Sequence, residues 1–245
     1  MILKIENLCL KNASGEKLVD GVSLELHRGE TLGLVGESGS GKTLTLRSLI
    51  GLLPRGIRQT YDTRQIDGNC AMIFQNPFSA LDPLCSVVAQ LMEIVKVRQK
   101  KNKTEARKIA EEWIRKLSLP EDLLLHDRYP GELSGGQCQR ILIAMALACQ
   151  PDILLCDEPT TALDVTVQKQ TLDLIQSLQK ELHFAVIFVT HNLAVAANLC
   201  DSLCVMQNGK IVEKGNTEEI LHHPQKEYTR VLLNSILTVP DREGE

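Results

Sequence analysis

The most informative segment of this chain reads Gly36-Glu37-Ser38-Gly39-Ser40-Gly41-Lys42-Thr43. It fits the pattern G-x-x-x-x-G-K-[ST], in which glycines let backbone N–H groups curl around a phosphate while the lysine and the hydroxyl reach the phosphates and Mg²⁺. The apolar run Thr31–Val35 precedes the segment, and apolar residues at helical spacing follow it from Leu46 to Leu53. This context predicts a buried strand, a phosphate-binding loop and a helix whose positive end faces the anion.

Continuous apolar runs later in the chain predict further buried strands. Ile153–Cys156 and Ala185–Val189 contain no alternating polar residues, which is typical of a parallel sheet covered by helices on both faces. Leu203–Met206 and Lys210–Glu213 flank Gln207-Asn208-Gly209, which is a hairpin signal. Additional elements are expected as a strand at Ala71–Phe74 and a helix over residues 167–181.

The middle of the chain, from about residue 76 to 150, is helical in pattern. One amphipathic stripe runs from Ala106 to Leu117, and Thr104 is expected to cap that helix. A second stripe, ending at Ala148, predicts a helix that begins after Ser134. Strand–loop–helix alternation on either side of this helical middle predicts an α/β core with an inserted helical subdomain. The first helix, after the phosphate loop, is expected to end only at Pro54.

Composition excludes several classes of protein. The chain is 43% hydrophobic, carries a net charge of -4 and is only 3% aromatic, which argues against a main task in binding nucleic acid. The longest apolar run, Ile141–Cys149, is about half of the ~20 residues that a membrane-spanning helix needs, and no signal peptide is recognised. The eight cysteines lack paired C-x-x-C spacing, so we expect reduced thiols in the core.

An acidic pair follows the predicted strand Ile153–Cys156. Asp157 is expected to hold the Mg²⁺ shell, because a carboxylate at the end of a buried strand has this role beside a phosphate loop. Glu158 is the candidate general base that polarises the attacking water. Without the loop, the pair would be interpreted as two solvated acids at the end of an ordinary strand.

A second glycine-rich helix start lies at Leu133-Ser134-Gly135-Gly136-Gln137, which we call the signature segment. The Ser134 hydroxyl is able to donate to an oxyanion, and the helix N-terminus favours the same negative charge. One nucleotide has little use for two separate anion-binding segments of one chain. We therefore expect the signature segment to serve a nucleotide bound by another subunit.

These motifs resemble, in their order and over nearly the whole chain, the ATP-binding cassette (ABC) transporter ATPases. The order is the phosphate loop, Gln75 after a strand, the signature segment, Asp157-Glu158, Ala162-Leu163-Asp164, and His191 after a strand. The resemblance implies an α/β P-loop NTPase (RecA-like) core with a parallel sheet, an N-terminal antiparallel β subdomain and an inserted helical subdomain. It also implies hydrolysis of ATP to ADP and phosphate.

The resemblance assigns a role to each matching residue. It implies a head-to-tail dimer with ATP between the phosphate loop of one subunit and the signature segment of the other. Gln75 is expected to bind Mg²⁺ and water and to couple to membrane subunits, Asp164 to link the two sites, and His191 to contact the γ-phosphate. The expected catalytic residues are Glu158, His191 and Gln75, and the expected metal ligands are Thr43, Gln75 and Asp157. The expected ATP contacts are Gly36, Glu37, Ser38, Gly39, Ser40, Gly41, Lys42, Thr43, Ser134, Gly135, Gly136, Gln137 and Asp164.

Two features depart from the family pattern. No aromatic residue precedes Tyr61, so we expect an aliphatic contact with adenine, from Leu18 or Val19. The segment between Lys42 and Gln75 is shorter than in peptide-importing relatives. The antiparallel subdomain is therefore expected to be reduced, with residues 61–69 as a short connection.

The segments Gln75–Pro83 and His223–Arg230 are similar to those of ATPases in peptide and nickel importers. Leu18–Leu24 and Leu53–Thr60 resemble the nickel-import subunit in particular, and no cysteine follows Cys204. The leading hypothesis is therefore coupling of ATP hydrolysis to uptake of nickel, or a nickel chelate, across the cytoplasmic membrane. The alternative is a dipeptide or oligopeptide importer ATPase.

This branch implies a set of partners and a division of the chain. The partners are two transmembrane permease subunits, a second ABC ATPase that is a paralogue, and an external solute-binding protein, with a peripheral location on the cytoplasmic face of the cell membrane. The expected parts are the N-terminal ATP-binding core (1–75), the helical subdomain with the signature segment (76–150), the C-terminal core (151–222) and a C-terminal tail (223–245).

Two other classes of protein compete with a transporter subunit. A soluble ABC ATPase, such as a ribosome-associated or DNA-repair factor, usually has two cassettes or a long coiled coil, and this sequence has one cassette and no sustained heptads. A scaffold that binds nucleotide without hydrolysis is disfavoured by the presence of Asp157, Glu158 and His191.

Overall fold

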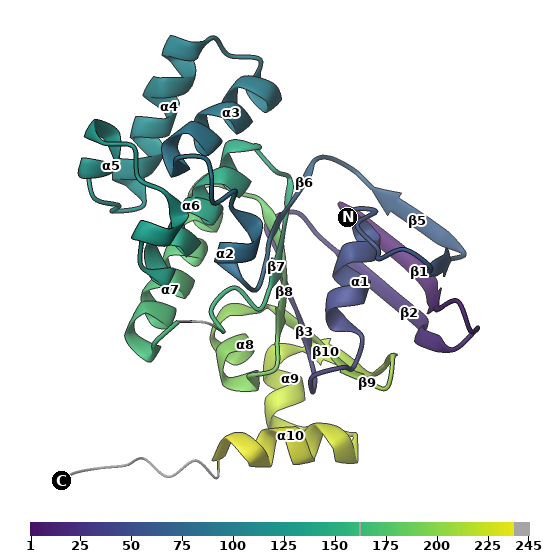
Figure 1. Ribbon diagram of the computed structural model, residues 1–245. Coiled ribbons are helices and arrows are strands. Elements are labelled where there is room, and N and C mark those ends of the chain that lie inside the picture. Colours follow the sequence, from purple (N-terminus) through teal and green to yellow (C-terminus); the bar gives the residue numbers. More distant parts are fainter. Residues whose placement is uncertain (162, 238–245) are drawn as a thin grey trace, which may run out of the picture. The chain divides into compact units, whose positions relative to one another are not determined.

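The computed structural model describes residues 1–161 and 163–237 (Figure 1). The chain forms two compact units. One unit combines Met1–Asp67 with Ala185–Glu245, and the other is Gly68–Phe184. Ala162, which belongs to the predicted Ala162-Leu163-Asp164 motif, and residues 238–245 of the predicted tail lie outside the described residues. The four functional parts expected from the sequence remain a prediction, because the compactness of the backbone does not test them.

The first unit contains an antiparallel sheet around β1 (Leu3–Lys11), which pairs with β2 (Lys17–Leu26), β4 (Arg58–Thr60) and β5 (Thr63–Ile66). Leu3 and Ile5 are buried along β1, and beyond Asn7 the buried positions become Leu8 and Leu10. Asn7 has a φ of 54°, and the β1–β2 register shifts at this point. The irregularity acts as a bulge that moves the apolar side chains back onto the buried face.

The expectation that residues 61–69 are a short connection is wrong, because β5 lies within them. Its register runs from Leu3 opposite Ile66 to Glu6 opposite Thr63. Backbone hydrogen bonds to β1 hold this strand, and no residue of β5 is fully buried. A strand held in this way has no apolar alternation by which the sequence reveals it.

The same unit contains a second group of strands around β3 (Thr31–Val35). β8 (Ala185–Thr190) and β9 (Ser202–Gln207) lie parallel to it on either side, and β10 (Lys210–Asn216) pairs antiparallel with β9. Every residue of β3 and β8 is buried, as the continuous apolar runs predict. The predicted hairpin is confirmed, and its turn residues Asn208 and Gly209 both have positive φ. The helices of this unit are α1 (Lys42–Leu49), α8 (Leu193–Leu199), α9 (Thr217–His222) and α10 (Glu227–Leu237).

Helix α1 ends earlier than its apolar pattern predicts. The expected end at Pro54 is wrong, because Gly51 adopts a φ of 72° directly after the C-cap residue Ile50. The N–H of Gly51 donates to the carbonyl of Ser48, and the N–H of Leu52 donates to that of Arg47. These two bonds form a Schellman motif, which closes a helix wherever a glycine supplies the left-handed conformation.

Replacing Gly51 with Ala is expected to lower the free energy of unfolding by about 1 kcal/mol, because a Cβ is disfavoured at positive φ. A Cβ built at Gly51 meets no atom within 4 Å, so the effect comes from the backbone alone. Gly131→Ala is the matched control, since a Cβ there also meets nothing and its φ is not positive. Urea unfolding of the two variants measures the difference, and equal midpoints would contradict the assignment of Gly51 as the helix stop.

The second unit contains two parallel strands, β6 (Cys70–Ile73) and β7 (Ile153–Asp157), together with most of the helices. Helix α6 (Gly135–Ala148) is buried on nearly all sides and packs against α2, α3, α4 and α7. The remaining helices of this unit are α2 (Pro77–Ala80), α3 (Val87–Gln99), α4 (Lys103–Lys116), α5 (Asp122–Leu125), a short 3₁₀ helix (Pro130–Glu132) and α7 (Val165–Leu182).

Two helix starts in this unit test the predicted caps. Helix α6 begins after Ser134, as predicted, and Ser134 is its N-cap. Thr104 is not the cap of α4, because Asn102 occupies that position: its side chain accepts from the Glu105 N–H, and the Glu105 carboxylate accepts from the Asn102 N–H. This reciprocal pair satisfies two backbone N–H donors at once, which makes it a more favourable cap than Thr104 alone inside the first turn.

The burial of the cysteines and the character of the helices were both predicted from the sequence. Cys138, Cys156, Cys200 and Cys204 are buried. Burial raises the pKa of the Cys138 thiol to about 11 and that of Cys204 to about 12, so both thiols are neutral near pH 7. In the part of the chain that the structure describes, none of the helices combines the length and the apolarity that crossing a bilayer requires.

Candidate functional site

The phosphate loop connects the buried strand β3 to helix α1 within the first unit. The Lys42 side chain is buried, and its Nζ donates to the carbonyl oxygens of Gly36 and Glu37, both at 2.7 Å. The Ser40 Oγ lies 3.4 Å from the same nitrogen. The ammonium group is therefore held inside the loop by its own backbone, where an anion would also be bound.

The start of the loop admits only glycine. A Cβ on Gly36, whose φ is 151°, would lie 2.1 Å from the carbonyl oxygen of Met206 in β9. At the other end of the loop, Gly41 is the N-cap of α1, and no side chain caps that helix. As a glycine, the N-cap residue of α1 offers no side-chain acceptor to the start of the helix, whereas Ser134 and Asp164 cap α6 and α7 with their side chains.

Sheet register places His191 beside the phosphate loop. Val35, the last residue of β3, is opposite Thr190, the last residue of the parallel strand β8. The loop begins immediately after Val35 and His191 follows Thr190, so both emerge from the same edge of the sheet. Asn192, next in the chain, caps α8 through the N–H groups of Ala194 and Val195. The expected pairing of His191 with a phosphate remains a prediction.

The second unit brings together the other predicted catalytic residues. Ile73 of β6 is opposite Cys156 of β7, so Gln75, Asp157 and Glu158 all lie at the same end of two neighbouring parallel strands. The Nε2 of Gln75 donates to the Oε2 of Glu158 at 3.2 Å. Asp157 is buried, with 2% of its surface exposed. More than eighty residues separate Gln75 and Glu158 in the sequence, so no local pattern predicts this contact. The parallel register of β6 and β7 brings the two residues together.

Glu158 carries two further features that the sequence did not reveal. Its φ is 46°, a conformation that is uncommon for a residue with a side chain and costs of order 1–3 kcal/mol. The Oγ1 of Thr161 donates to the Oε2 of Glu158 at 2.8 Å. Thr161 was missed because a threonine in the turn after a strand has no distinctive pattern. Together, Gln75 and Thr161 orient the candidate base.

The signature segment forms the first turn of α6. Ser134 Oγ accepts from the N–H of Gln137 at 3.3 Å, and the Gln137 side chain accepts from the N–H of Ser134 at 2.9 Å. This arrangement leaves the Ser134 hydroxyl proton available to donate. Gly136 lies against α7, where a Cβ would meet the Cγ1 of Val167 at 2.7 Å. Gly136 thus allows α6 and α7 to approach each other closely.

Gly136→Ala is expected to lower the free energy of unfolding by about 1–3 kcal/mol, because the added methyl group overpacks this contact. Val167→Ala removes the atom that it meets, so the double variant should recover most of the loss. Thermal unfolding of the two single variants and the double variant measures the coupling. Additive losses in the double variant would contradict the close approach of the two helices.

Asp164 and the two candidate adenine contacts are the remaining residues predicted from the sequence. Asp164 is the N-cap of α7, with its Oδ1 accepting from the N–H of Val167 at 3.0 Å; its expected role in linking two sites remains a prediction. Val19 is fully buried, so the expectation that it contacts adenine is wrong. A Cβ on Gly41 would lie 3.2 Å from the Val19 Cγ2, which shows that this side chain packs beneath the loop. Leu18, which is partly exposed, remains the candidate.

Comparison with known proteins identifies the family of this chain. Residues 19–161 match the family model described as ABC transporter. The oligopeptide transport ATP-binding protein AmiE of Streptococcus pneumoniae is 43% identical over 93% of this chain and 69% of its own length. The glutathione import ATP-binding protein GsiA of Shigella dysenteriae is 41% identical over 96% of this chain, which spans 42% of that longer protein.

Solved structures give the same assignment. A dimeric ATP-binding cassette in a post-hydrolysis state, bound to ADP and Pi, superposes with a TM-score of 0.74 and 27% identity, covering 88% of this chain and 98% of its own. CbiO1 of Clostridium perfringens, part of the ABC transporter complex CbiONQ, has a TM-score of 0.76 and 28% identity over 98% of this chain and 96% of its own. The predicted P-loop NTPase fold is confirmed. The chain belongs to the ABC transporter family, of which it carries the ATPase domain.

Proposed function

We propose that this chain is the ATP-hydrolysing subunit of an ABC importer that takes up peptides. The observation that carries the proposal is the similarity to AmiE along almost the whole chain, together with a complete set of catalytic motifs. GsiA supports the same class of cargo, since glutathione is a tripeptide. Uptake of nickel, which the segments at 18–24 and 53–60 favour, is the second candidate. The names of these relatives support peptides instead.

The residues of the loop fit the triphosphate of ATP. The Lys42 ammonium and the N–H groups at the start of α1 are donors of the kind that phosphate oxygens accept. Thr43, Gln75 and Asp157 offer a hydroxyl, an amide and a carboxylate oxygen, which suit Mg²⁺ as a hard cation. When bound, Mg²⁺ would neutralise charge on the β- and γ-phosphates.

Hydrolysis is assigned to Glu158 and His191. Glu158 would accept a proton from the water that attacks the γ-phosphorus, and its carboxylate is oriented by Gln75 and Thr161. His191, at the sheet edge beside the loop, would donate to the γ-phosphate and so stabilise the charge that develops there. Apart from this proton transfer, the chain's contribution would be positioning and electrostatic stabilisation.

The importer would be a multi-subunit assembly. We propose that Ser134, Gly135, Gly136 and Gln137 bind the ATP of a second ABC ATPase, in a head-to-tail dimer with a paralogue, and that Asp164 links the two sites. Two transmembrane permease subunits and an external solute-binding protein complete the proposed complex. The chain would then lie at the cytoplasmic face of the membrane, attached through its partners.

Transport measurements distinguish the two cargoes. Cells that lack this chain are supplied with the wild-type chain or with a Lys42→Met variant, and uptake of a labelled tripeptide and of radioactive nickel is measured. Peptide uptake that depends on the wild-type chain is the expected result. Uptake of nickel but not peptide would replace the proposed cargo, and no change in either would contradict the proposal of an importer.

ATPase assays test the coupling to membrane subunits. The complex with its permease subunits, purified in detergent, is expected to hydrolyse ATP faster than the isolated chain. An equal rate would instead support a soluble ABC ATPase.

A further inference from the structure

The C-terminal helix α10 contacts the phosphate loop through one side chain. The hydroxyl oxygen of Tyr228 accepts a hydrogen bond from the backbone N–H of Glu37 at 3.1 Å, although 191 positions separate the two residues. Both residues lie in the first unit. Tyr228 is partly buried, and burial raises the pKa of its phenol, which is therefore neutral near pH 7.

The peptide groups of Glu37 are thereby held on two sides. The N–H donates to Tyr228, and the carbonyl accepts from the Lys42 Nζ at 2.7 Å. Glu37 itself is exposed, so packing of its side chain does not hold it in place. These two hydrogen bonds fix the second residue of the loop. It follows Gly36, where the Met206 carbonyl leaves no room for a Cβ.

Helix α10 is itself anchored near its start. The Glu213 carboxylate of β10 accepts from the N–H groups of Gln225 at 2.6 Å and Lys226 at 3.2 Å. Burial alone would raise the pKa of Glu213, but the hydrogen bonds to its carboxylate hold the pKa below its usual value. The carboxylate thus stays ionised at neutral pH, which strengthens its hold on the two amides.

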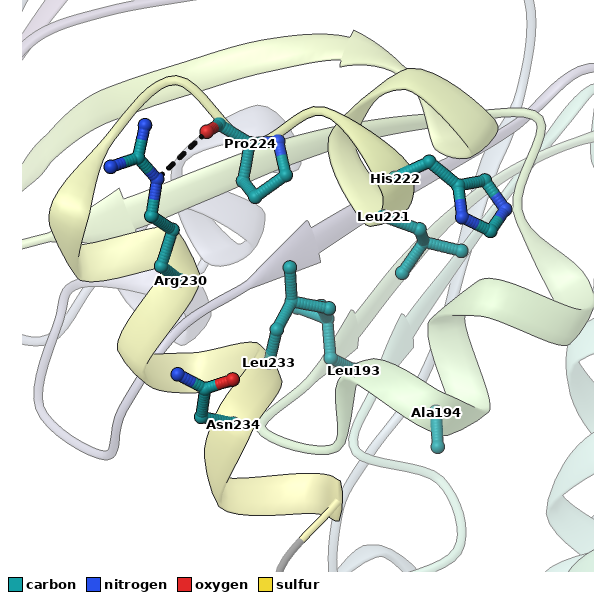
Figure 2. Close-up of a pocket in the computed structure, with 8 residues that line it drawn as sticks. All are labelled: Leu193, Ala194, Leu221, His222, Pro224, Arg230, Leu233 and Asn234. Carbon is teal, nitrogen blue, oxygen red and sulfur yellow. Dashed lines mark hydrogen bonds between the residues drawn. The ribbon is translucent and has the colours of Figure 1, made fainter.

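One further hydrogen bond and the packing of α10 near α8 define the position of this helix. The Nε of Arg230 donates to the carbonyl of Pro224 at 3.0 Å, which ties the first turn of α10 to the segment before it (Figure 2). Farther along α10, Leu233 faces the same cavity as Leu193 of α8. Tyr228 is therefore presented to the loop from a helix that contacts α8 and that follows directly on two residues hydrogen-bonded to β10.

We propose that Tyr228 is a positioning residue that keeps the phosphate loop in its anion-binding conformation, so that α10 sets the affinity of this chain for nucleoside triphosphate. The inference rests on the proposed ATP-binding function. A loop that is preorganised binds more tightly, because the apparent dissociation constant is the intrinsic one divided by the fraction of molecules in the competent conformation. Loss of the acceptor leaves the Glu37 N–H unpaired and lowers that fraction.

Tyr228→Phe removes only the hydroxyl oxygen and tests this role. The Kd for ATP is expected to rise about fivefold, which is the size of one lost hydrogen bond. Tyr61→Phe is the matched control, because Tyr61 lies in the same unit, is 46% exposed and is expected to leave the Kd unchanged. Fluorescence titration with an ATP analogue gives the Kd, and an ¹⁵N–¹H spectrum of the chain reports the Glu37 amide directly.

The positioning role predicts a specific combination of results. The Glu37 amide should shift upfield and exchange faster in Tyr228→Phe, with the melting temperature close to that of the wild type. In the assembled ATPase, KM for ATP should rise while kcat stays unchanged, because the hydroxyl orders the loop and takes no part in the chemistry. A Kd within twofold of the wild type, or an unshifted Glu37 amide, would overturn the proposal.

A second variant covers the case in which Tyr228→Phe fails to fold, which the spectrum would reveal. Glu213→Gln weakens the anchor of α10 and leaves Tyr228 in place, so it should raise the Kd in the same direction; an unchanged Kd would overturn the proposal. Failure of the proposed function looks different. In that case the wild-type chain itself would bind no ATP, whereas failure of the Tyr228 role leaves wild-type binding intact.

Discussion

Replacing Glu158 with Gln is expected to lower ATP turnover by about 10²-fold or more, while ATP still binds. Gln has nearly the same size as Glu and keeps an oxygen that accepts from Gln75 and Thr161. Gln and Glu are branched in the same way, so the φ of 46° at position 158 costs about the same free energy in the variant and in the wild type. The variant therefore loses the proton acceptor and little else.

Steady-state hydrolysis and nucleotide titration of the same preparation measure this effect. Glu112→Gln is the matched control, because it makes the same chemical change at an exposed position of α4 in the same unit. Its turnover should equal that of the wild type. Full turnover in Glu158→Gln would remove Glu158 from the role of general base, and a loss of ATP binding in that variant would show that the residue acts through the loop instead.

Lys42→Met is expected to weaken ATP binding by about 10²-fold, with hydrolysis lost at cellular ATP concentrations. Methionine keeps the buried aliphatic stem and removes the ammonium group, which lies 2.7 Å from two loop carbonyls. Truncating one partner of a buried, charged hydrogen-bonded pair costs about 2–5 kcal/mol, and about 2.7 kcal/mol corresponds to the expected factor.

Lys11→Met is the matched control for this variant. Lys11 is an exposed residue at the end of β1 in the same unit, so its loss removes one positive charge without changing the loop. ATP titration at two salt concentrations separates the local effect from the change in net charge, because only the latter is screened. Wild-type affinity in Lys42→Met would contradict its assignment to the phosphates. A melting temperature far below that of the control would show that the ammonium mainly stabilises the loop.

Local sequence patterns were sufficient wherever an element depends on its own residues. The continuous apolar runs identified β3, β7 and β8, whose residues are all buried. Helix α6 begins after Ser134, as predicted, and Ser134 and Gln137, three positions apart, cap it. In each case the interacting groups are neighbours in the chain, so their spacing carries the information.

Patterns failed where a distant strand, the conformation of a single residue or tertiary packing decides the structure. β5 exists because β1 offers unpaired backbone groups, and nothing within Thr63–Ile66 indicates this. The end of α1 was misplaced because the apolar spacing continues past Gly51, whose positive φ stops the helix. Val19 was considered available to a ligand, but it is covered by the loop that packs above it.

By itself, the sequence was sufficient to predict the class of nucleotide hydrolase, which the comparisons confirm, and to select the phosphate loop and the acidic pair as candidate site residues, because each depends on residue types at fixed short spacing. Only the tertiary structure revealed which groups orient them: Gln75 on Glu158 across two parallel strands, His191 beside the loop through the register of β3 and β8, and Tyr228 on Glu37 from the opposite end of the chain. Contacts between distant segments arise from sheet register and helix packing, and no local pattern encodes them.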